Sequence, residues 1–333
     1  MLAALDLGGN PSSVHGAGRA LRRVLDCARN RIASAYGVQD DDVVFTSGGT
    51  EANALAITGL RAGRRVIVGA TEHDAVRQAA PDAVVLPVDQ NGVADLVALA
   101  HLLQDGPALV CLMAANNETG TRQPIAAAAA LCRTHGALLH VDAVQARVPF
   151  DLPVLGAHSV ALSAHKIGGP HGAGALLLHG VDPMPHLRGG GQERGRRGGT
   201  PAVAALAGFA AAVGCDWPDL LRWRIQIEAM AIARGAVVLG GTDRLSNTVC
   251  LALPGMRANA QVIALDLAGI HVSAGAACSS GTVGDSHVLR AMGAEGLASQ
   301  AIRVSLPWSC IAADVVAFCD AYATLTTRAA RAA

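Results

Sequence analysis

Ser159-Val160-Ala161-Leu162-Ser163-Ala164-His165-Lys166 is a short apolar run that ends in polar residues, and the glycine-rich segment Gly168–Gly174 follows it. The pattern predicts a buried strand with a tight turn at its carboxyl end. Lys166 is the one lysine in the sequence, and the other 25 of the 26 Lys and Arg residues are arginines. Because arginine cannot form an imine at neutral pH, a lysine kept only here indicates Schiff-base chemistry, although most loop lysines are ordinary surface residues. We expect apolar neighbours to desolvate it.

Short β-rich runs alternate with longer segments rich in Ala, Leu and Arg through the first two thirds of the chain. This alternation is typical of β-α units that build a mainly parallel sheet, so we predict an α/β fold. Helices are expected at Glu51–Leu60 and Ile125–His135. The expected strands are Arg65–Val68, Val84–Val88, Leu109–Met113, Leu138–Val141, Ser159–Leu162 and Ala175–Leu178.

The pattern changes in the last third, where a helix-like stretch, Pro201–Ala233, leads to short strands near Val237–Leu239. We therefore predict a large domain over residues 1–224 and a smaller α+β domain over residues 225–333. In the smaller domain, the segment His271–Gly284 is rich in Gly, Ser and Ala, and we expect it to form a loop that carries Cys278.

The composition is that of an Ala-rich globular enzyme, with 51% hydrophobic residues, 3% aromatic residues and a mean hydropathy of +0.36. Lys plus Arg and Asp plus Glu number 26 each, so no global field attracts nucleic acid or a membrane. The longest nearly apolar stretch, Pro201–Cys215, is shorter than the ~18 residues of a membrane span. One local exception is Glu193-Arg194-Gly195-Arg196-Arg197, whose cations could serve a small anion.

The eight cysteines are scattered without a C-x-x-C pair, and no signal segment is evident at the first residues. We therefore predict a cytoplasmic protein with reduced thiols and no metal site of its own.

Leu138-Leu139-His140-Val141-Asp142 places an aspartate at the end of a hydrophobic strand. A carboxylate buried there needs a cationic or strongly donating partner, which the ring nitrogen of pyridoxal phosphate would supply. Gln145, three residues on, could donate to the ring hydroxyl. For Asp142 considered alone, a helix cap is the alternative.

A second polar stretch, Thr46-Ser47-Gly48-Gly49-Thr50-Glu51, combines glycines and hydroxyls ahead of an expected helix. Backbone N–H groups and the helix dipole would make it an anion site that fits a phosphate. A plain capping turn has the same appearance.

These motifs, in this order, resemble the cysteine desulfurases of the class V aminotransferase superfamily, over almost the whole chain. The long cysteine segment resembles the first of the two groups of that family. The resemblance implies fold type I of the pyridoxal-phosphate-dependent transferases, with a mainly parallel seven-stranded sheet and a smaller C-terminal domain. It rests further on Asn10-Pro11-Ser12-Ser13-Val14-His15, Thr71-Glu72-His73, Asn116-Asn117-Glu118-Thr119-Gly120, Glu193–Thr200, Ser273–Ser280 and Ala301–Leu306.

By position, the resemblance implies that Lys166 holds pyridoxal 5′-phosphate as a Schiff base and that His73 stacks on its ring and moves protons. Asp142 would pair with the ring nitrogen. Arg303, together with Asn117, would hold the substrate carboxylate; a structural arginine is the alternative. Further cofactor contacts are implied for Gly49, Thr50, Asn117, Gln145, Ser163 and His165, and for Thr200 from the second subunit of a homodimer.

The resemblance makes Cys278 the sulfur acceptor, so that L-cysteine yields L-alanine and the sulfur stays on Cys278 as a persulfide. We expect the other seven cysteines to be buried and inert. The implied partner is an iron–sulfur scaffold, with which Cys278 could transiently ligate a cluster, or another sulfur-accepting protein.

One departure from the family concerns the beginning of the chain. Family members usually carry an additional strand and turn well before the segment that corresponds to Asn10-Pro11, so we expect a shortened N-terminal element here. The alternatives are a selenocysteine lyase, another class V aminotransferase, or a non-catalytic binding protein. An aminotransferase has no need of Cys278, whereas the sequence does not separate cysteine from selenocysteine.

Overall fold

A computed structural model describes residues 1–275 and 285–332 of the chain. Cys278, the predicted sulfur acceptor, therefore lies outside the described residues. The chain divides into two compact units. Unit 1 consists of Met1–Leu86, Leu96–Ala114 and Pro124–Asp216, and unit 2 consists of Pro87–Asp95, Ala115–Gln123 and Trp217–Ala333.

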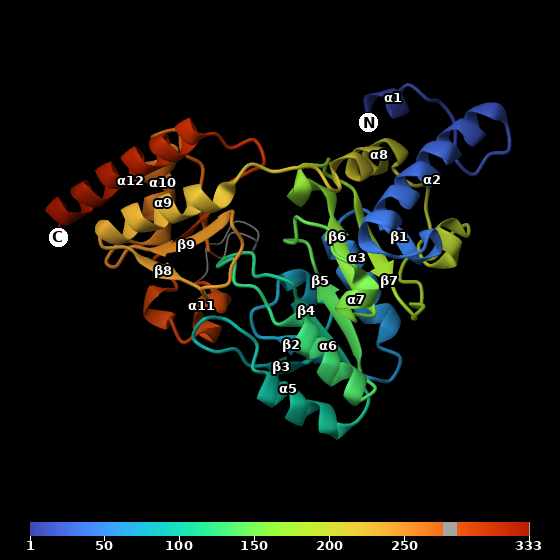
Figure 1. Cartoon of the computed structure of the whole chain (residues 1–333), viewed down its shortest axis with the longest axis horizontal. Coiled ribbons are helices and arrows are strands. Elements are labelled where there is room, and N and C mark those ends of the chain that lie inside the picture. The colour runs from blue at the N-terminus through green and yellow to red at the C-terminus, as the bar shows by residue number, and fades with distance from the viewer. Residues whose placement is uncertain (276–284, 333) are drawn as a thin grey trace. The chain divides into compact units, whose positions relative to one another are not determined.

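Unit 1 is built on a seven-stranded sheet of order β1-β7-β6-β5-β4-β2-β3 (Figure 1). All neighbouring strands are parallel except that β7 runs antiparallel to both β1 and β6. The mainly parallel seven-stranded sheet confirms the predicted fold class. The strands are β1 (Val43–Thr46), β2 (Arg65–Gly69), β3 (Val84–Leu86), β4 (Ala108–Met113), β5 (Leu138–Asp142), β6 (Ser159–Ser163) and β7 (Gly174–Leu178).

Strands β4, β6 and β7 are buried along their whole length, which explains why they appear in the sequence as continuous apolar runs. The six predicted strands are present within one or two residues of their expected bounds. Strand β1 was not predicted, because Val43–Thr46 is four residues long and follows an acidic turn, Asp40–Asp42.

Helices cover both faces of this sheet, and α2 lies side by side with α8 (Figure 1). Helix α2 buries Leu21, Leu25, Ala28 and Ile32, an i, i+4, i+7 spacing that places one apolar stripe toward the core. The helices of unit 1 are α1 (Leu2–Leu5), α2 (Gly16–Tyr36), α3 (Gly49–Leu60), α4 (Asp74–Arg77), α5 (Leu96–Leu102), α6 (Ile125–Thr134), α7 (Leu152–Leu155) and α8 (Val203–Ala212).

Unit 2 contains a four-stranded antiparallel sheet of order β10-β11-β9-β8. Alternate residues of β9 face opposite sides: Val249 and Leu251 pack with the long helices, whereas Cys250 and Ala252 pack with α11. The elements are β8 (Val237–Leu239), β9 (Thr248–Ala252), β10 (Ser273–Ala274), β11 (Ala301–Ser305), α9 (Leu220–Ala233), α10 (Ala258–Asp266), α11 (His287–Ala291) and α12 (Ala312–Ala332).

Two sequence expectations need correction. The helix-like stretch Pro201–Ala233 is interrupted between α8 and α9, because Gly214, with φ +74°, and Pro218 end one helix before the next begins at its Asp219 cap. Of the cysteines expected to be buried, Cys27 and Cys215 are exposed and Cys319 is half-buried. Cys27 lies on the outward face of α2, and Cys215 lies in the connection after α8. None of the helices in the described part of the chain is long and apolar enough to cross a membrane.

Gly174, the first residue of β7, lies against the backbone at the start of α3. A Cβ atom at Gly174 would stand 2.6 Å from the Cα of Gly48 and 2.7 Å from the carbonyl oxygen of Leu162. Because backbone atoms must move to relieve such contacts, we predict that Gly174→Ala lowers the free energy of unfolding by about 1–3 kcal/mol. Urea denaturation measures the change.

The matched control is Gly16→Ala, because a Cβ atom on Gly16 meets nothing within 4 Å. This variant should be as stable as the wild type or slightly more stable, since alanine favours helix. Equal urea midpoints for the two variants would contradict the close approach at Gly174.

Candidate active site

The polar residues singled out in the sequence gather at one edge of the unit 1 sheet. Strand β5 ends at Asp142, and β6 ends at Ser163, ahead of His165 and Lys166. Thr46, the last residue of β1, pairs with Gly174, which in turn pairs with Ser163. Because carboxyl ends of parallel strands share one edge, side chains far apart in the sequence meet there.

The start of α3 has the geometry of an anion cradle. Gly48 is the N-cap residue, Gly49 is buried and Thr50 is exposed at the first turn. A Cβ atom on Gly49 would lie 2.4 Å from Cγ2 of Val144, and one on Gly48 would lie 4.0 Å from Oγ of Ser163. A side chain at Gly49 would therefore collide with the turn after β5, whereas backbone N–H groups remain at the helix N-terminus for a phosphate.

The turn after β6 holds three of the predicted residues. Oγ of Ser163 lies 3.0 Å from Nδ1 of His165. Burial lowers the pKa of His165, and the positive charges of Lys166 and His171 lower it further, so this ring is more often neutral near pH 7. Lys166 is exposed, so the expectation that apolar neighbours desolvate it is wrong. The following segment, Gly168–Gly174, consists mostly of glycines and offers few side chains with which to cover the lysine.

Asp142 is a buried carboxylate with 6% exposure. Its Oδ1 accepts a hydrogen bond from the backbone N–H of Val144 at 3.0 Å, and its Oδ2 accepts one from Nδ2 of Asn53 at 2.9 Å. Burial raises the pKa of Asp142, while these hydrogen bonds and the charges of His73 and Lys166 act in the opposite direction. A carboxylate has about four acceptor positions, so two donors leave capacity for a further, strong donor.

Two adjacent residues of unit 1 complete this edge. His73 is half-buried and caps α4 (Asp74–Arg77), with Nδ1 accepting from the N–H of Ala75 at 3.0 Å. Glu72 is fully buried, and its Oε1 accepts from the N–H of Met113 at 2.6 Å. Burial, and then the charge of Asp142, raise the pKa of Glu72 well above its usual value, which favours a protonated carboxyl group.

The sequence prediction gave no role to Glu72, Asn53 or His140. The available signal was the presence of polar residues inside otherwise apolar elements, since Asn53 lies within Glu51–Leu60 and His140 lies within a hydrophobic strand. Gln145, predicted near the cofactor ring, is half-buried in the turn after β5.

Asn117 and Arg303, predicted to bind the substrate carboxylate, lie together in unit 2. Nη1 of Arg303 donates to the carbonyl oxygen of Asn117 at 3.4 Å, and Arg303 is on the central strand β11. Nε of Arg303 is buried and has no hydrogen-bond partner among the residues that the structure describes. This guanidinium therefore retains a donor for an anionic ligand.

The basic run predicted to serve an anion is instead paired with carboxylates of the same unit. Arg194 contacts Asp41, Arg196 contacts Asp182, and Arg197 contacts Glu51. These arginines are therefore ion-paired within unit 1, because acidic residues from other elements pack against the run.

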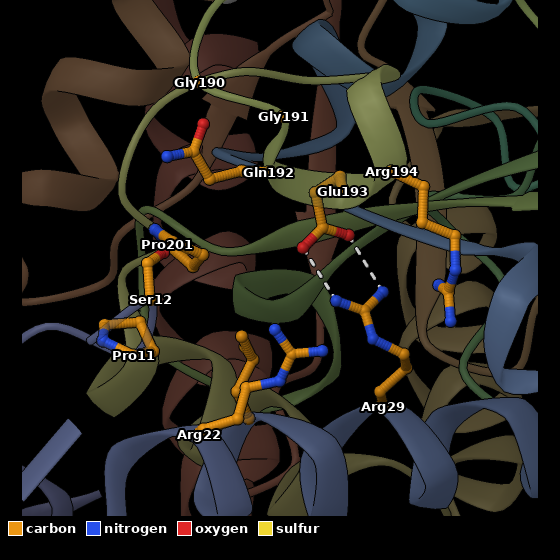
Figure 2. Close-up of a pocket in the computed structure, with 11 residues that line it drawn as sticks. Pro11, Ser12, Arg22, Arg29, Gly190, Gly191, Gln192, Glu193, Arg194 and Pro201 are labelled. Carbon is orange, nitrogen blue, oxygen red and sulfur yellow. Dashed lines mark hydrogen bonds and ion pairs between the residues drawn. The ribbon is translucent and has the colours of Figure 1, made fainter. Parts of the chain in front are cut away.

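Two ion pairs hold the segment Gly189–Thr200 in place. Arg29 of α2 forms two hydrogen bonds of 2.8 and 2.7 Å to Glu193, and both side chains are at most 6% exposed. Figure 2 shows this pair beside a pocket of about 360 Å³ into which Arg22 also extends. Arg197 donates to Glu51 of α3 at 2.7 and 3.2 Å. Although burial alone would raise it, the pKa of Glu51 is lowered by its hydrogen bonds to Arg197 and Ser47.

The backbone of this segment is strained at two of the residues that form ion pairs, Glu193 and Arg194. Glu193 and Arg194 have φ values of +48° and +56°, a left-handed conformation that costs a non-glycine residue about 1–2 kcal/mol. Strain of this kind persists only where surrounding contacts fix it. The ion pairs that Arg29 and Glu51 form with this segment fix its backbone. Thr200, at the end of the segment, is exposed.

A lysine after one parallel strand, a buried aspartate after its neighbour and a helix N-terminus at the same edge define the class V aminotransferase type of enzyme. The family model described as Aminotransferase class-V matches residues 4–318. A cysteine desulfurase from Cereibacter sphaeroides is 43% identical, and the match covers 92% of this chain and 86% of that relative. An IscS-like cysteine desulfurase from Mycobacterium tuberculosis is 36% identical, with coverages of 98% and 91%.

The solved structure of a NifS-like protein from Rickettsia africae matches with a TM-score of 0.89 at 31% identity, over 97% of this chain and 93% of that chain. Within the class V aminotransferases, the chain belongs to the cysteine desulfurase family.

Proposed function

We propose that this enzyme uses pyridoxal 5′-phosphate to convert L-cysteine into L-alanine and passes the sulfur to Cys278 as a persulfide. The observation that carries the proposal is the gathering of Asp142, Ser163, His165 and Lys166 beside the N-terminus of α3. Family membership supports the same reaction.

The residues of unit 1 fit this cofactor in two respects. Asp142 is a buried carboxylate with acceptor capacity left for a ring N–H, and Gly49 sits where only a residue without a side chain fits. When bound, pyridoxal phosphate supplies an imine and an electron sink that weaken the Cα–H and Cβ–S bonds of the substrate.

Each residue of unit 1 then has a definite task. Nζ of Lys166 holds the cofactor covalently and afterwards moves the Cα proton. Asp142 keeps the ring nitrogen protonated, and His73 packs on the ring. Gln145 contacts the ring hydroxyl, and Gly49, Thr50, Ser163 and His165 contact the phosphate. For Asn117, a residue of unit 2, the family resemblance implies a contact to the ring hydroxyl.

Arg303 binds the substrate carboxylate, for which a planar guanidinium offers two parallel donors. The thiolate of Cys278 attacks the substrate sulfur, so that an S–S bond forms as the Cβ–S bond breaks. The electron pair left on Cβ takes up a proton and gives alanine. The sulfur is oxidised and the carbon reduced, so no external oxidant is needed.

We further propose a homodimer in which Thr200 of each subunit reaches the phosphate of the other. The persulfide would pass to an iron–sulfur scaffold or another acceptor protein. We place the enzyme in the cytoplasm, because the seven described cysteines are all free thiols, as expected in a reducing compartment.

The first prediction from this function is that Lys166→Arg abolishes both the visible absorbance band, expected near ~420 nm, and alanine production. The charge is kept, but a guanidinium cannot form the imine. Because Lys166 is exposed, the thermal unfolding midpoint should equal that of the wild type stripped of its cofactor. A variant that keeps the band and turns over cysteine would refute the lysine assignment.

A second prediction separates cofactor chemistry from sulfur transfer. Cys278→Ser should still bind cysteine and change its absorbance, while alanine release falls by about 100-fold or more, because a hydroxyl is a poor nucleophile toward sulfur. Sulfur-labelled cysteine followed by mass spectrometry of the peptide containing Cys278 locates the label.

Cys27→Ser and Cys215→Ser are matched controls, because both thiols are exposed and free. They should retain full alanine release and full labelling at Cys278. Label on another cysteine of the wild type, or undiminished release by Cys278→Ser, would remove Cys278 from the mechanism.

A third prediction concerns the dimer. Thr200→Ala should weaken binding of pyridoxal phosphate about tenfold, because one hydrogen bond to a charged group is lost. Cofactor titration of the stripped protein measures the change, and sedimentation gives the subunit number. An active monomer that holds the cofactor as tightly as the dimer would contradict the contribution of a second subunit.

A further inference from the structure

Four buried side chains form one hydrogen-bonded chain that ends at Asp142. Oδ2 of Asp142 lies 2.9 Å from Nδ2 of Asn53, and Oδ1 of Asn53 lies 2.8 Å from Nε2 of His140. Nδ1 of His140 lies 2.9 Å from Oγ of Ser159. Asn53 comes from α3, His140 from β5 and Ser159 from β6, and all three are at most 1% exposed.

Strand geometry explains why these groups meet. His140 and Asp142 are two residues apart on β5, so their side chains project to the same face of the sheet. Ser159 is the direct neighbour of His140 in the register of β5 and β6. Helix α3 packs on this face, which brings Asn53 between the histidine and the carboxylate.

An ionised Asp142 fixes the direction of every hydrogen bond in the chain. The carboxylate only accepts, so Asn53 donates through Nδ2 and turns its Oδ1 toward the histidine. Nε2 of His140 must then carry the proton, and Nδ1 accepts from the hydroxyl of Ser159. The histidine is neutral in this arrangement, and burial lowers the pKa of His140 to about 3.

The opposite direction also keeps all the bonds, but it requires a protonated Asp142 as the donor to Asn53. A protonated Asp142 would donate to Oδ1 of Asn53, Nδ2 of Asn53 would donate to Nε2 of His140, and Nδ1 of His140 would donate to Ser159. Passing from one arrangement to the other needs an amide rotation, a tautomer change and a hydroxyl rotation among side chains that are at most 6% exposed.

We propose that Asn53 and His140 are positioning residues that hold Asp142 ionised and direct its remaining acceptor positions to the ring nitrogen of the cofactor. The inference rests on the proposed function. The backbone N–H of Val144 supports the same direction, because it donates to Oδ1 of Asp142 at 3.0 Å.

The other titratable groups that act on Asp142 are consistent with this assignment. The charges of His73 and Lys166 favour the ionised carboxylate. Glu72 is buried beside Asp142, and its own pKa is raised well above the usual value by burial and then by the charge of Asp142. Burial raises the pKa of both carboxyl groups, but it raises that of Glu72 well above the usual value, so Asp142 is the more readily ionised of the two.

The first test reads the direction of the chain without any variant. Ring-nitrogen NMR of ¹⁵N-histidine-labelled protein, before and after removal of pyridoxal phosphate, should find His140 protonated at Nε2 only and unchanged between about pH 5 and 8. His140→Gln identifies the signal. A His140 protonated at Nδ1 would overturn the proposal.

The second test compares three variants. His140→Phe should weaken binding of pyridoxal phosphate about tenfold, as expected from the loss of support to a charged group, and change the pH at which the visible band titrates. His140→Gln keeps a donor for Asn53 and should restore both values to near wild type. His158→Phe is the control. Nδ1 of His158 accepts a hydrogen bond from the backbone N–H of Leu139, the neighbour of His140 on β5, but His158 is not part of the chain that ends at Asp142.

Equal cofactor affinity and band titration in His140→Phe and the wild type would overturn the positioning role. Failure of the proposed function has a different signature: the wild type would bind no pyridoxal phosphate and release no alanine. The ring-nitrogen measurement on the protein alone still decides the direction of the chain in that case.

Discussion

The burial of the Asp142 carboxylate is the constraint on which the rest of the site depends. A charge at the end of a central strand loses most of its hydration, and this loss must be offset by donors that the fold supplies. The turn at Val144 and the α3 residue Asn53 supply two of them. Because α3 also presents its N-terminus at the same edge, one helix both supports the carboxylate and forms the anion cradle.

Close approach of backbones is the second constraint. The pairing of Thr46, Gly174 and Ser163 across three strands brings the end of β1 beside the end of β6. Glycines are required where a Cβ atom would meet backbone within 3 Å, as at Gly174. The strained turn at Glu193 is held by a side-chain contact instead, the buried ion pair with Arg29. Disruption of this pair would leave an uncompensated charge.

Short sequence signals predicted much of this organisation. Continuous apolar runs predicted the buried parallel strands, and the polar residues directly after them predicted Asp142, Ser163, His165 and Lys166 at a common edge. The sequence did not indicate that Pro87–Asp95 and Ala115–Gln123 belong to unit 2, because their composition does not differ from that of neighbouring loops. Nor did it indicate that Arg194, Arg196 and Arg197 each form an ion pair with a carboxylate, since those partners lie more than ten residues away in the sequence.

The sequence by itself determined the chemical types at the site, because one lysine, one strand-end aspartate and one glycine turn are local features of the chain. The tertiary structure alone decided their environment. Asn53 and His140 are 87 residues apart, and only the packing of α3 on β5 brings them into one hydrogen-bonded chain with Asp142. The exposure of Lys166 and the raised pKa of Glu72 were likewise decided by packing, because hydration and neighbouring charge depend on what surrounds a side chain in space.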